Sequence, residues 1–291
     1  MAGVPVRAGS RRLRAGDLLE VELALSGPPA GAGEVEAPGG AGGPDRAPAA
    51  AVVFADDHLV VVDKPAGLVV HPGAGNRQGT LVQQLLLRFA DIATAGPDDE
   101  RPGIVQRLDK GTSGLLVVAR SPAARQGLVA QLAARSVERR YLAVLYGELE
   151  ADEGVVEAPL GRSPRSRLKM AVVEGGRDAR THYRADARSA SPLPVSMVTC
   201  RLETGRTHQV RAHFAAIGHA VVADQRYAKA NELAVTRRVL PALRRPWLHA
   251  AHLGFVHPVT GQAMSFSSAL PADLQQTLAV LGLAERTSSV P

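Results

Sequence analysis

Short apolar runs separated by polar turns recur along this chain and predict β-strands. The clearest is Leu-Leu-Val-Val-Ala at residues 115–119, which is too short for a helix. Gly114 precedes the run and Ser121-Pro122 follows it, so we expect a buried strand between them. Similar runs or alternating patterns predict a β-hairpin at 52–62 and strands at 141–147, 181–184 and 195–203.

Apolar residues at helical spacing predict helices elsewhere in the chain. Ser121 and Pro122 suit the cap and first position of a helix that ends by about Arg135, with Leu128 and Leu132 facing the core. Further helices are predicted at 80–89, 231–245 and 271–283, and the polar Gly- and Pro-containing segment 91–101 predicts a mobile loop.

The segment from Gly205 to Gly218 also has helical spacing, and it carries several polar residues. On such a helix His208 and Arg211 share a face, because they lie three residues apart. Thr207 is placed to cap the start of the helix, and the free N–H groups of a first turn suit a phosphate. Gly218 stands where a helix stop belongs.

Composition divides the chain into three parts. Residues 1–25 read as a short basic hairpin with a Gly16-Asp17 turn, and residues 26–50 are rich in Gly, Ala and Pro and predict a flexible linker. Residues 51–285 are expected to form one large domain, which the chain length allows. One interpretation of the hairpin is a basic flap without a function.

The charge of the chain favours a polyanionic partner. The net charge is +6 and the sequence pI is about 10.0, which points toward nucleic acid, although coding bias toward Arg and Ala gives the same trend. The single cysteine, Cys200, excludes an intrachain disulfide and fits a reducing cytoplasm. No stretch has the length of a membrane span or the apolar core of a signal peptide, so we expect a cytoplasmic protein.

The turn before residues 115–119 holds one carboxylate between two cations. Asp109 lies beside Arg107 and Lys110, and nearby cations favour an ionised carboxylate. A charged carboxylate on a rigid support suits nucleophilic chemistry. The alternative is a salt-bridged surface aspartate in a hairpin.

Neither a metal nor a cofactor is expected. His208 and His213 are five residues apart and do not share a helix face, and His249-x-x-His252 has no Cys or carboxylate cluster beside it. A nucleotide-binding glycine fingerprint is also absent from the sequence.

Two motifs carry a resemblance to a known family. Arg107-Leu108-Asp109-x-x-Thr112-Ser113-Gly114 resembles the catalytic motif of RluA-type pseudouridine synthases, and Gly205-Arg206-Thr207-His208-Gln209-Val210-Arg211 resembles a downstream motif of the same family. Matches in the same order extend from about residue 51 to 270, including Tyr141 at the start of a strand and a closing strand at 248–258. One departure is Gln106, where the family usually has histidine.

The resemblance implies an α+β fold with a mixed, mostly antiparallel central sheet, flanking helices and a central RNA-binding cleft. It implies an isomerase without a cofactor, in which Asp109 acts on the target nucleotide, Arg211 pairs with Asp109, and Tyr141 stacks on the base or helps to remove its carbon 5 proton. The N-terminal hairpin is similar to the second half of an S-four RNA-binding domain. RNA contacts are expected from Lys64, Arg107, Arg165, Lys169, Arg206, His208 and Gln209.

The expected substrate is large-subunit (23S) ribosomal RNA, with transfer RNA as the runner-up, and the protein is expected to be a monomer. Two other functions stay open. One is an RNA-binding protein without catalytic activity, and the other is a hydrolase with Asp109 as its nucleophile, for which no second carboxylate is visibly paired with Asp109. A hydrolase would release free uracil or sugar.

Overall fold

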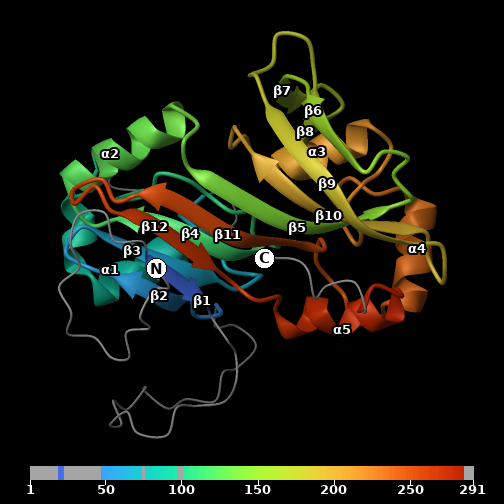
Figure 1. The fold of residues 1–291 in the computed structure, drawn as a ribbon, viewed down its shortest axis with the longest axis horizontal. Helices are drawn as coiled ribbons and strands as arrows, with labels where there is room; N and C mark the ends of the chain where they lie inside the picture. Colours follow the sequence, from blue (N-terminus) through green and yellow to red (C-terminus); the bar gives the residue numbers. More distant parts are fainter. Residues whose placement is uncertain (1–18, 23–46, 74–75, 97–100, 285–291) are drawn as a thin grey trace, which may run out of the picture.

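The structure is a computed structural model that describes residues 19–22, 47–73, 76–96 and 101–284. These residues form the expected α+β fold around a ten-stranded mixed sheet (Figure 1). Its main path runs β2 (Ala51–Ala55), β3 (Leu59–Lys64), β4 (Ser113–Ala119), β11 (Leu248–Val256), β5 (Glu138–Tyr146), β10 (Val195–Leu202), β9 (Arg180–Ser189) and β6 (Glu153–Glu157).

Two strands lie off this path, and two more form a separate hairpin. Strand β12 (Ala263–Ser267) pairs with β11, and β1 (Leu19–Glu22) pairs with β12. Strands β7 (Leu160–Ser163) and β8 (Ser166–Val172) form the separate hairpin. Among the described strands, only the β4–β11 and β1–β12 pairs are parallel, so the expectation of a mostly antiparallel sheet is confirmed.

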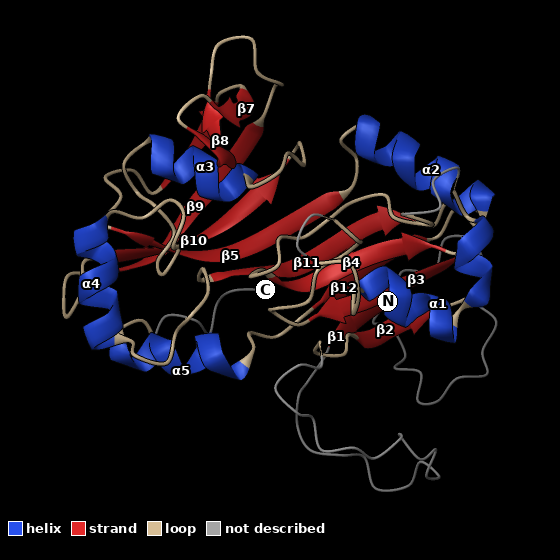
Figure 2. Cartoon of the chain, turned by 180° about the vertical axis from the view of Figure 1, so that it is seen from behind, coloured by secondary structure: helices blue, strands red, loops and turns tan. Residues whose placement is uncertain are grey.

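The helices flank the sheet as expected. They are α1 (Leu81–Arg88), the 3-10 helix η1 (Ala90–Thr94), α2 (Pro122–Ala133), α3 (Gln209–Ala216), α4 (Ala230–Val239) and α5 (Ala272–Val280). Figures 1 and 2 show α2 toward one end of the sheet and the β7–β8 hairpin with α3 toward the other, with the long strand β5 between them.

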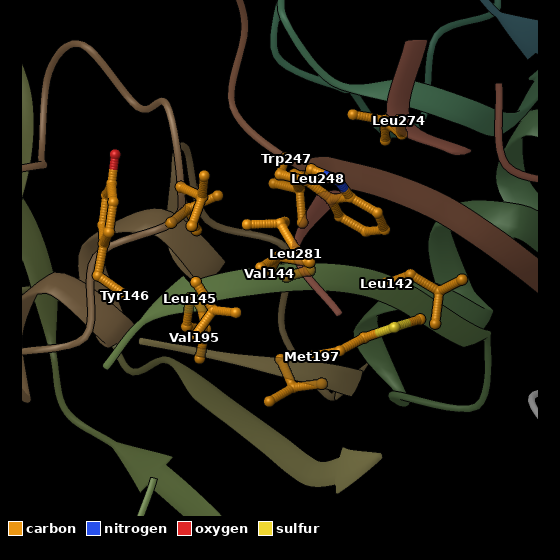
Figure 3. Packing of buried hydrophobic residues seen from close by; sticks show 14 of the residues in the cluster. Leu142, Val144, Leu145, Tyr146, Val195, Met197, Trp247, Leu248, Leu274 and Leu281 are labelled. Atoms are coloured by element: carbon orange, nitrogen blue, oxygen red, sulfur yellow. The ribbon is translucent and has the colours of Figure 1, made fainter. Parts of the chain in front are cut away.

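Burial follows the apolar pattern of the sequence. Every residue of β4 is buried, as the run at 115–119 predicts. The largest apolar cluster packs residues of β5 and β10 against Trp247 and against α5 and the residues after it (Figure 3). The ring of Trp247 is fully buried, and its Nε1–H donates to Thr277 Oγ1 at 2.7 Å. This packing fixes the strands that reach the centre of the molecule.

Several expectations need correction. The segment predicted as a mobile loop starts with η1, because Ile92 is fully buried there. Residues 1–18 and 23–46 lie outside the described part, but Leu19–Glu22 belongs to the edge of the large sheet. The last residues of the predicted linker are not free: the backbone N–H of Ala50 donates to Gln84 Oε1 at 3.2 Å. Strands β6, β7, β8 and β12 were not predicted.

Helix α3 begins later than its spacing predicts. His208 is its N-cap residue and has a left-handed backbone with φ of 55°, so the helix starts at Gln209. Thr207 is therefore not the cap, and His208 does not lie on the helix face of Arg211. Gly218 follows the helix with φ of +90°, in agreement with the predicted stop.

Candidate active site

The turn that carries Asp109 lies directly before β4 and is pressed against β11. Gly114 has a φ of +114°, and a Cβ atom on it would lie 2.2 Å from the carbonyl oxygen of Ala250. Glycine is therefore required for this close approach of two backbones. The backbone N–H of Thr112 donates to the carbonyl oxygen of Asp109 at 3.0 Å, which closes the turn. Both contacts fix Asp109 relative to the sheet.

Arg211 on α3 connects Asp109 to a second carboxylate. Its Nη1 donates to Asp109 Oδ2 at 2.8 Å, and its Nε and Nη2 donate to the two oxygens of Asp224 at 2.6 and 2.8 Å. Asp224 is fully buried, whereas the Asp109 side chain is 16% exposed. The expected pairing of Arg211 with Asp109 is thus present, and it joins residues 102 positions apart in the chain.

The charge of Arg211 is held in place by its surroundings. Burial alone lowers the pKa of Arg211, but the hydrogen bonds and charges of Asp224 and Asp109 raise it above its ordinary value. The guanidinium also lies over the Tyr227 ring, with 5.1 Å between Cζ and the ring centroid. A permanent cation therefore lies 2.8 Å from the Asp109 carboxylate.

Tyr227 and His208 form the wall beside this pair. The Tyr227 hydroxyl accepts from the backbone N–H of Met170 at 2.9 Å and lies 2.9 Å from His208 Nδ1. The other ring nitrogen of His208, Nε2, is 3.9 Å from Asp109 Oδ1. Burial lowers the pKa of His208, so we expect a neutral ring near Asp109 at pH 7.

Tyr141 reaches the same place from β5. Its ring is partly buried and lies opposite Cys200 of β10 in the sheet register. Burial raises the pKa of Tyr141 to about 12, and the nearby charge of Arg139 acts in the opposite direction. The phenol is therefore protonated at neutral pH in the free protein.

These residues line one groove with a volume of about 460 Å³. Asp109, Tyr141, His208 and Arg211 all contribute to its surface, so the structure brings the three predicted catalytic residues together. Other lining residues include Arg101, Gln106, Arg107, Arg139, Gly205 and Arg206. Among the described residues that line it, the groove is thus cationic around a single, partly exposed carboxylate.

Two residues predicted to contact RNA are buried inside the protein. Lys64 is fully buried and donates to the carbonyl oxygens of Pro65 and Leu68 at 3.0 and 2.9 Å. Gln209 is 3% exposed, and its side-chain amide bonds to four groups of the protein, including Thr204 Oγ1 at 2.7 Å. Neither side chain is free to bind RNA in this structure, and both instead hold the chain around the groove.

The other predicted RNA contacts lie nearer the surface. Arg107 is exposed at the groove, and Arg206 is partly buried there, with its Nε donating to the carbonyl oxygen of Asp178 at 3.0 Å. Arg165 is exposed on the β7–β8 hairpin. Lys169 on the same hairpin places its Nζ 5.8 Å from the centroid of the Tyr227 ring.

Sequence reasoning missed three residues of the site: Asp224, Tyr227 and Arg139. Asp224 and Tyr227 lie within the part of the sequence that resembles the family, from about residue 51 to 270, and that resemblance was the available signal. Arg139 stands two residues before Tyr141, so strand alternation places both side chains on one face. Gln106 also lines the groove, and its buried Nε2 has no hydrogen-bond partner among the described residues.

Comparison with known proteins agrees with this geometry. Residues 58–216 match the family described as RNA pseudouridylate synthase. The chain belongs to this family. It is 47% identical over 238 residues to a protein of Zymomonas mobilis named ribosomal large subunit pseudouridine synthase D, a match that covers 81% of this chain and 74% of the relative. A protein of Xanthomonas campestris with the same name is 48% identical over 235 residues, which cover 79% of this chain and 69% of that relative.

Solved structures show the same fold. Human RNA pseudouridylate synthase domain containing 1 has a TM-score of 0.61 at 25% identity, with 86% of this chain and 99% of that chain covered. The human domain-containing 4 protein has a TM-score of 0.60 at 24% identity and covers 80% of this chain and 93% of its own. Its membership of the RNA pseudouridylate synthase family makes the protein an isomerase that acts on RNA, as the resemblance implies.

The remaining expectations concern metals and membranes. Within the described ranges, no group of three or more His, Cys, Asp or Glu residues is arranged to hold a metal ion. The helices of that same part of the chain are all too short or too polar to cross a membrane.

Proposed function

We propose that this pseudouridine synthase modifies uridines of large-subunit ribosomal RNA. The relatives from Zymomonas mobilis and Xanthomonas campestris, both named for that substrate, support this choice over transfer RNA. The net charge of +6 agrees with an RNA partner. A cytoplasmic location and a monomeric state stay predictions.

The observation that carries the proposed mechanism is the Asp109 carboxylate, 2.8 Å from Arg211 in a groove also lined by Tyr141. Asp109 acts on carbon 1 of the target ribose. The bond from that carbon to uracil nitrogen 1 breaks, the base turns, and a new bond forms from the same carbon to carbon 5. Carbon 5 loses its proton and nitrogen 1 gains one, so the atoms balance without an oxidant or reductant.

Arg211 positions Asp109 in this reaction. Its guanidinium is fixed by two bonds to the buried Asp224, and its third donor therefore points at Asp109 in a set direction. A charge-assisted pair of this kind orients the carboxylate. The arrangement supplies a nucleophile that needs no separate base to activate it.

Tyr141 has two possible roles, and its protonation state favours one of them. With a pKa of about 12, roughly one molecule in 10⁵ carries the phenolate at pH 7. Stacking on the uracil ring needs no phenolate. We therefore assign stacking on the uracil ring as the role of the protonated Tyr141, and proton removal from carbon 5 requires that substrate binding first lowers its pKa.

The target uridine has to leave the RNA stack to reach Asp109. Extrusion of a nucleotide costs a few kcal/mol, which contacts between cationic side chains and phosphates offset. Arg107 and Arg206 line the groove, and Arg165 and Lys169 extend the cationic surface onto the β7–β8 hairpin. We propose that these four side chains contact the RNA backbone, and that Arg107 fills the space left by the target base.

The decisive experiment maps pseudouridine in total RNA from cells with and without this gene. We expect loss of pseudouridine at one or more large-subunit positions, restored by the wild-type gene and not by Asp109→Ala. Purified Asp109→Ala is expected to bind RNA with unchanged affinity, and Asp57→Ala, on an exposed turn, serves as the control.

Three results would contradict the proposal in different ways. Loss of pseudouridine from transfer RNA alone would redirect the substrate. Restoration of pseudouridine by the Asp109→Ala gene would mean that the protein acts only by binding RNA. Release of free uracil in a purified reaction would identify a hydrolase.

A further inference from the structure

Arg139 is a buried arginine whose charge has no counterion in the described part of the protein. Three arginines are buried there. Arg211 pairs with Asp109 and Asp224, and Arg245 pairs with Asp273. Arg139 is 5% exposed, yet no described carboxylate lies within 4.0 Å of it.

The partners of Arg139 are two backbone carbonyl groups. Its Nη2 donates to the carbonyl oxygens of Leu202 and Glu203, at 3.4 and 3.1 Å. The buried Nε has no hydrogen-bond partner among the described residues, and no bond is made by Nη1 to any of them. A buried cation left this way is costly to the folded state unless something else supplies negative charge.

The nearest carboxylate is committed to other side chains. The Glu203 carboxylate lies 3.0 Å from Arg135 and 2.5 Å from His182, and a third cation, Arg180, is 3.6 Å away. It therefore does not serve as the counterion of Arg139. Because the described residues provide none, we look to the substrate as the source of negative charge.

Arg139 borders the groove, and its Nη1 lies on the side of Gly205, which also borders it. Arg139 lines it together with Tyr141 and Gly205. A Cβ atom on Gly205 would lie 2.8 Å from Arg139 Nη1, so the glycine leaves room for the guanidinium. Arg139 and Tyr141 stand on the same face of β5, and the charge of Arg139 acts on the phenol of Tyr141.

The reaction of the proposed function places a negative charge on the uracil ring inside the groove, and a cation there stabilises it. When Asp109 acts on the ribose carbon, the electron pair of the broken bond leaves with uracil, and the negative charge spreads over nitrogen 1 and the two ring oxygens. A fixed donor in a site shielded from water stabilises charge as it develops. Phosphates are expected at the rim, where Arg107 and Arg206 are more exposed than Arg139.

We propose that Arg139 is a catalytic residue that binds an oxygen of the uracil ring and stabilises the uracil anion while the bond to the sugar is broken. This inference rests on the proposed function of Asp109. It assigns the buried cation to the leaving group, Tyr141 to the face of the base, and Arg211 to the nucleophile.

The test compares Arg139→Gln with Arg140→Gln, whose side chain lies on the opposite face of β5 and pairs with Glu138. Single-turnover rates are measured at saturating RNA that carries uridine or 5-fluorouridine at the target. Fluorine stabilises the uracil anion by itself, and it cannot leave as a proton, so the fluorinated RNA reports bond breaking alone. RNA affinity and the unfolding midpoint are measured in parallel.

We expect Arg139→Gln to lower the rate on uridine by about 10²-fold or more with RNA affinity within about 2-fold, as for the loss of one oxyanion donor. The defect should shrink by about 10-fold with 5-fluorouridine, while Arg140→Gln stays at the wild-type rate. Equal defects on both RNAs would overturn the assignment. A loss confined to RNA affinity would instead indicate that Arg139 binds a phosphate. A rate defect on uridine that is absent on 5-fluorouridine would indicate that Arg139 assists proton removal from carbon 5.

Two controls keep the result interpretable. If Arg139→Gln does not fold, Arg139→Lys decides, since it retains the charge without the planar fork; a defect that shrinks with fluorine supports the proposal and equal defects overturn it. Wild-type activity in Arg139→Gln, with Asp109→Ala inactive, would overturn the role of Arg139 and leave the proposed function intact. Activity in Asp109→Ala would overturn the proposed function itself.

Discussion

Asp224→Asn tests whether the buried second carboxylate sets the geometry of the nucleophile. Asp224 accepts three hydrogen bonds: two from Arg211, and one from the backbone N–H of Arg226 at 3.0 Å. Asparagine keeps the size of the side chain and one acceptor oxygen. Its amide group then faces one donor of Arg211, so one charge-assisted bond is lost and two donors confront each other.

The magnitude follows from these contacts. A hydrogen bond to a charged group contributes about 1.5–3 kcal/mol, and breaking a buried ion pair costs about 3–5 kcal/mol. We expect a loss of about 3 kcal/mol in the free energy of unfolding, because Arg211 retains Asp109 as a partner. A guanidinium released on one side no longer points at Asp109 in a set direction, and a displacement of about 1 Å lowers turnover by about 10²-fold.

The assay separates these two effects. Urea unfolding is followed by the fluorescence of Trp247, the single tryptophan, which is fully buried. Turnover is measured as pseudouridine formation in RNA. Asp186→Asn is the matched control, because its side chain is 5% exposed and bonded to Arg184 and Thr199 away from the groove. Wild-type turnover in Asp224→Asn, or an equal loss in Asp186→Asn, would refute the reasoning.

Two further predictions concern the support of the site. Burial lowers the pKa of Lys64 from 10.5 to about 7, so between these values the unfolded chain binds a proton that the folded chain does not. The free energy of unfolding should therefore rise with pH across this window, by about 5 kcal/mol at most. In urea unfolding at pH 7.5–9.5, Lys64→Met should flatten this dependence of the free energy on pH. An unchanged dependence would contradict the burial argument. Gly114→Ala should destabilise by more than about 3 kcal/mol through its clash with Ala250, while Gly218→Ala, with nothing within 4 Å, loses about 1 kcal/mol from its left-handed backbone; similar losses in the two variants would mean that the turn relaxes.

The sequence predicted the strands with continuous apolar runs better than the short polar ones. Strand β4 was predicted because its buried residues form a continuous apolar run, and its boundaries carry a glycine and a Ser-Pro pair. Strands β6 and β7 were missed because they mix exposed and buried residues without a clear period. Their pairing comes from long-range partners, which a local pattern does not contain.

The predicted start of α3 was wrong for a different reason. Apolar spacing around Val210 and Phe214 predicted the helix, but the spacing does not report a left-handed residue at its N-cap. His208 takes that conformation with its Nδ1 held at 2.9 Å from the Tyr227 hydroxyl. A contact across 19 residues thus set the boundary, and no local signal was available for it.

Buried polar residues explain why the site was only partly predicted. The sequence alone does not show whether Lys64 and Gln209 are exposed or buried. In the fold, both side chains are buried and bond to other groups of the protein. Asp224 and Arg139 were missed for the same reason, since their roles depend on which charges lie near them in space. Residue type and motif predicted Asp109 as the nucleophile and Arg211 as its partner, whereas Asp224 and Arg139 had to be found from the structure.

The position of Asp109, the proposed nucleophile, depends on the central strands of the sheet. Asp109 comes from the turn before β4, and Arg211 comes from α3, which contacts β8 and β9. Strands β11, β5 and β10 lie between β4 and β9 in the sheet order, so the 2.8 Å contact between Asp109 and Arg211 depends on the register of three intervening strands. A one-residue slip in this ladder would reverse the faces of Arg139 and Tyr141 as well. The same buried ladder that stabilises the fold therefore sets the geometry of catalysis, and substitutions in it are expected to lower turnover even where they touch no RNA.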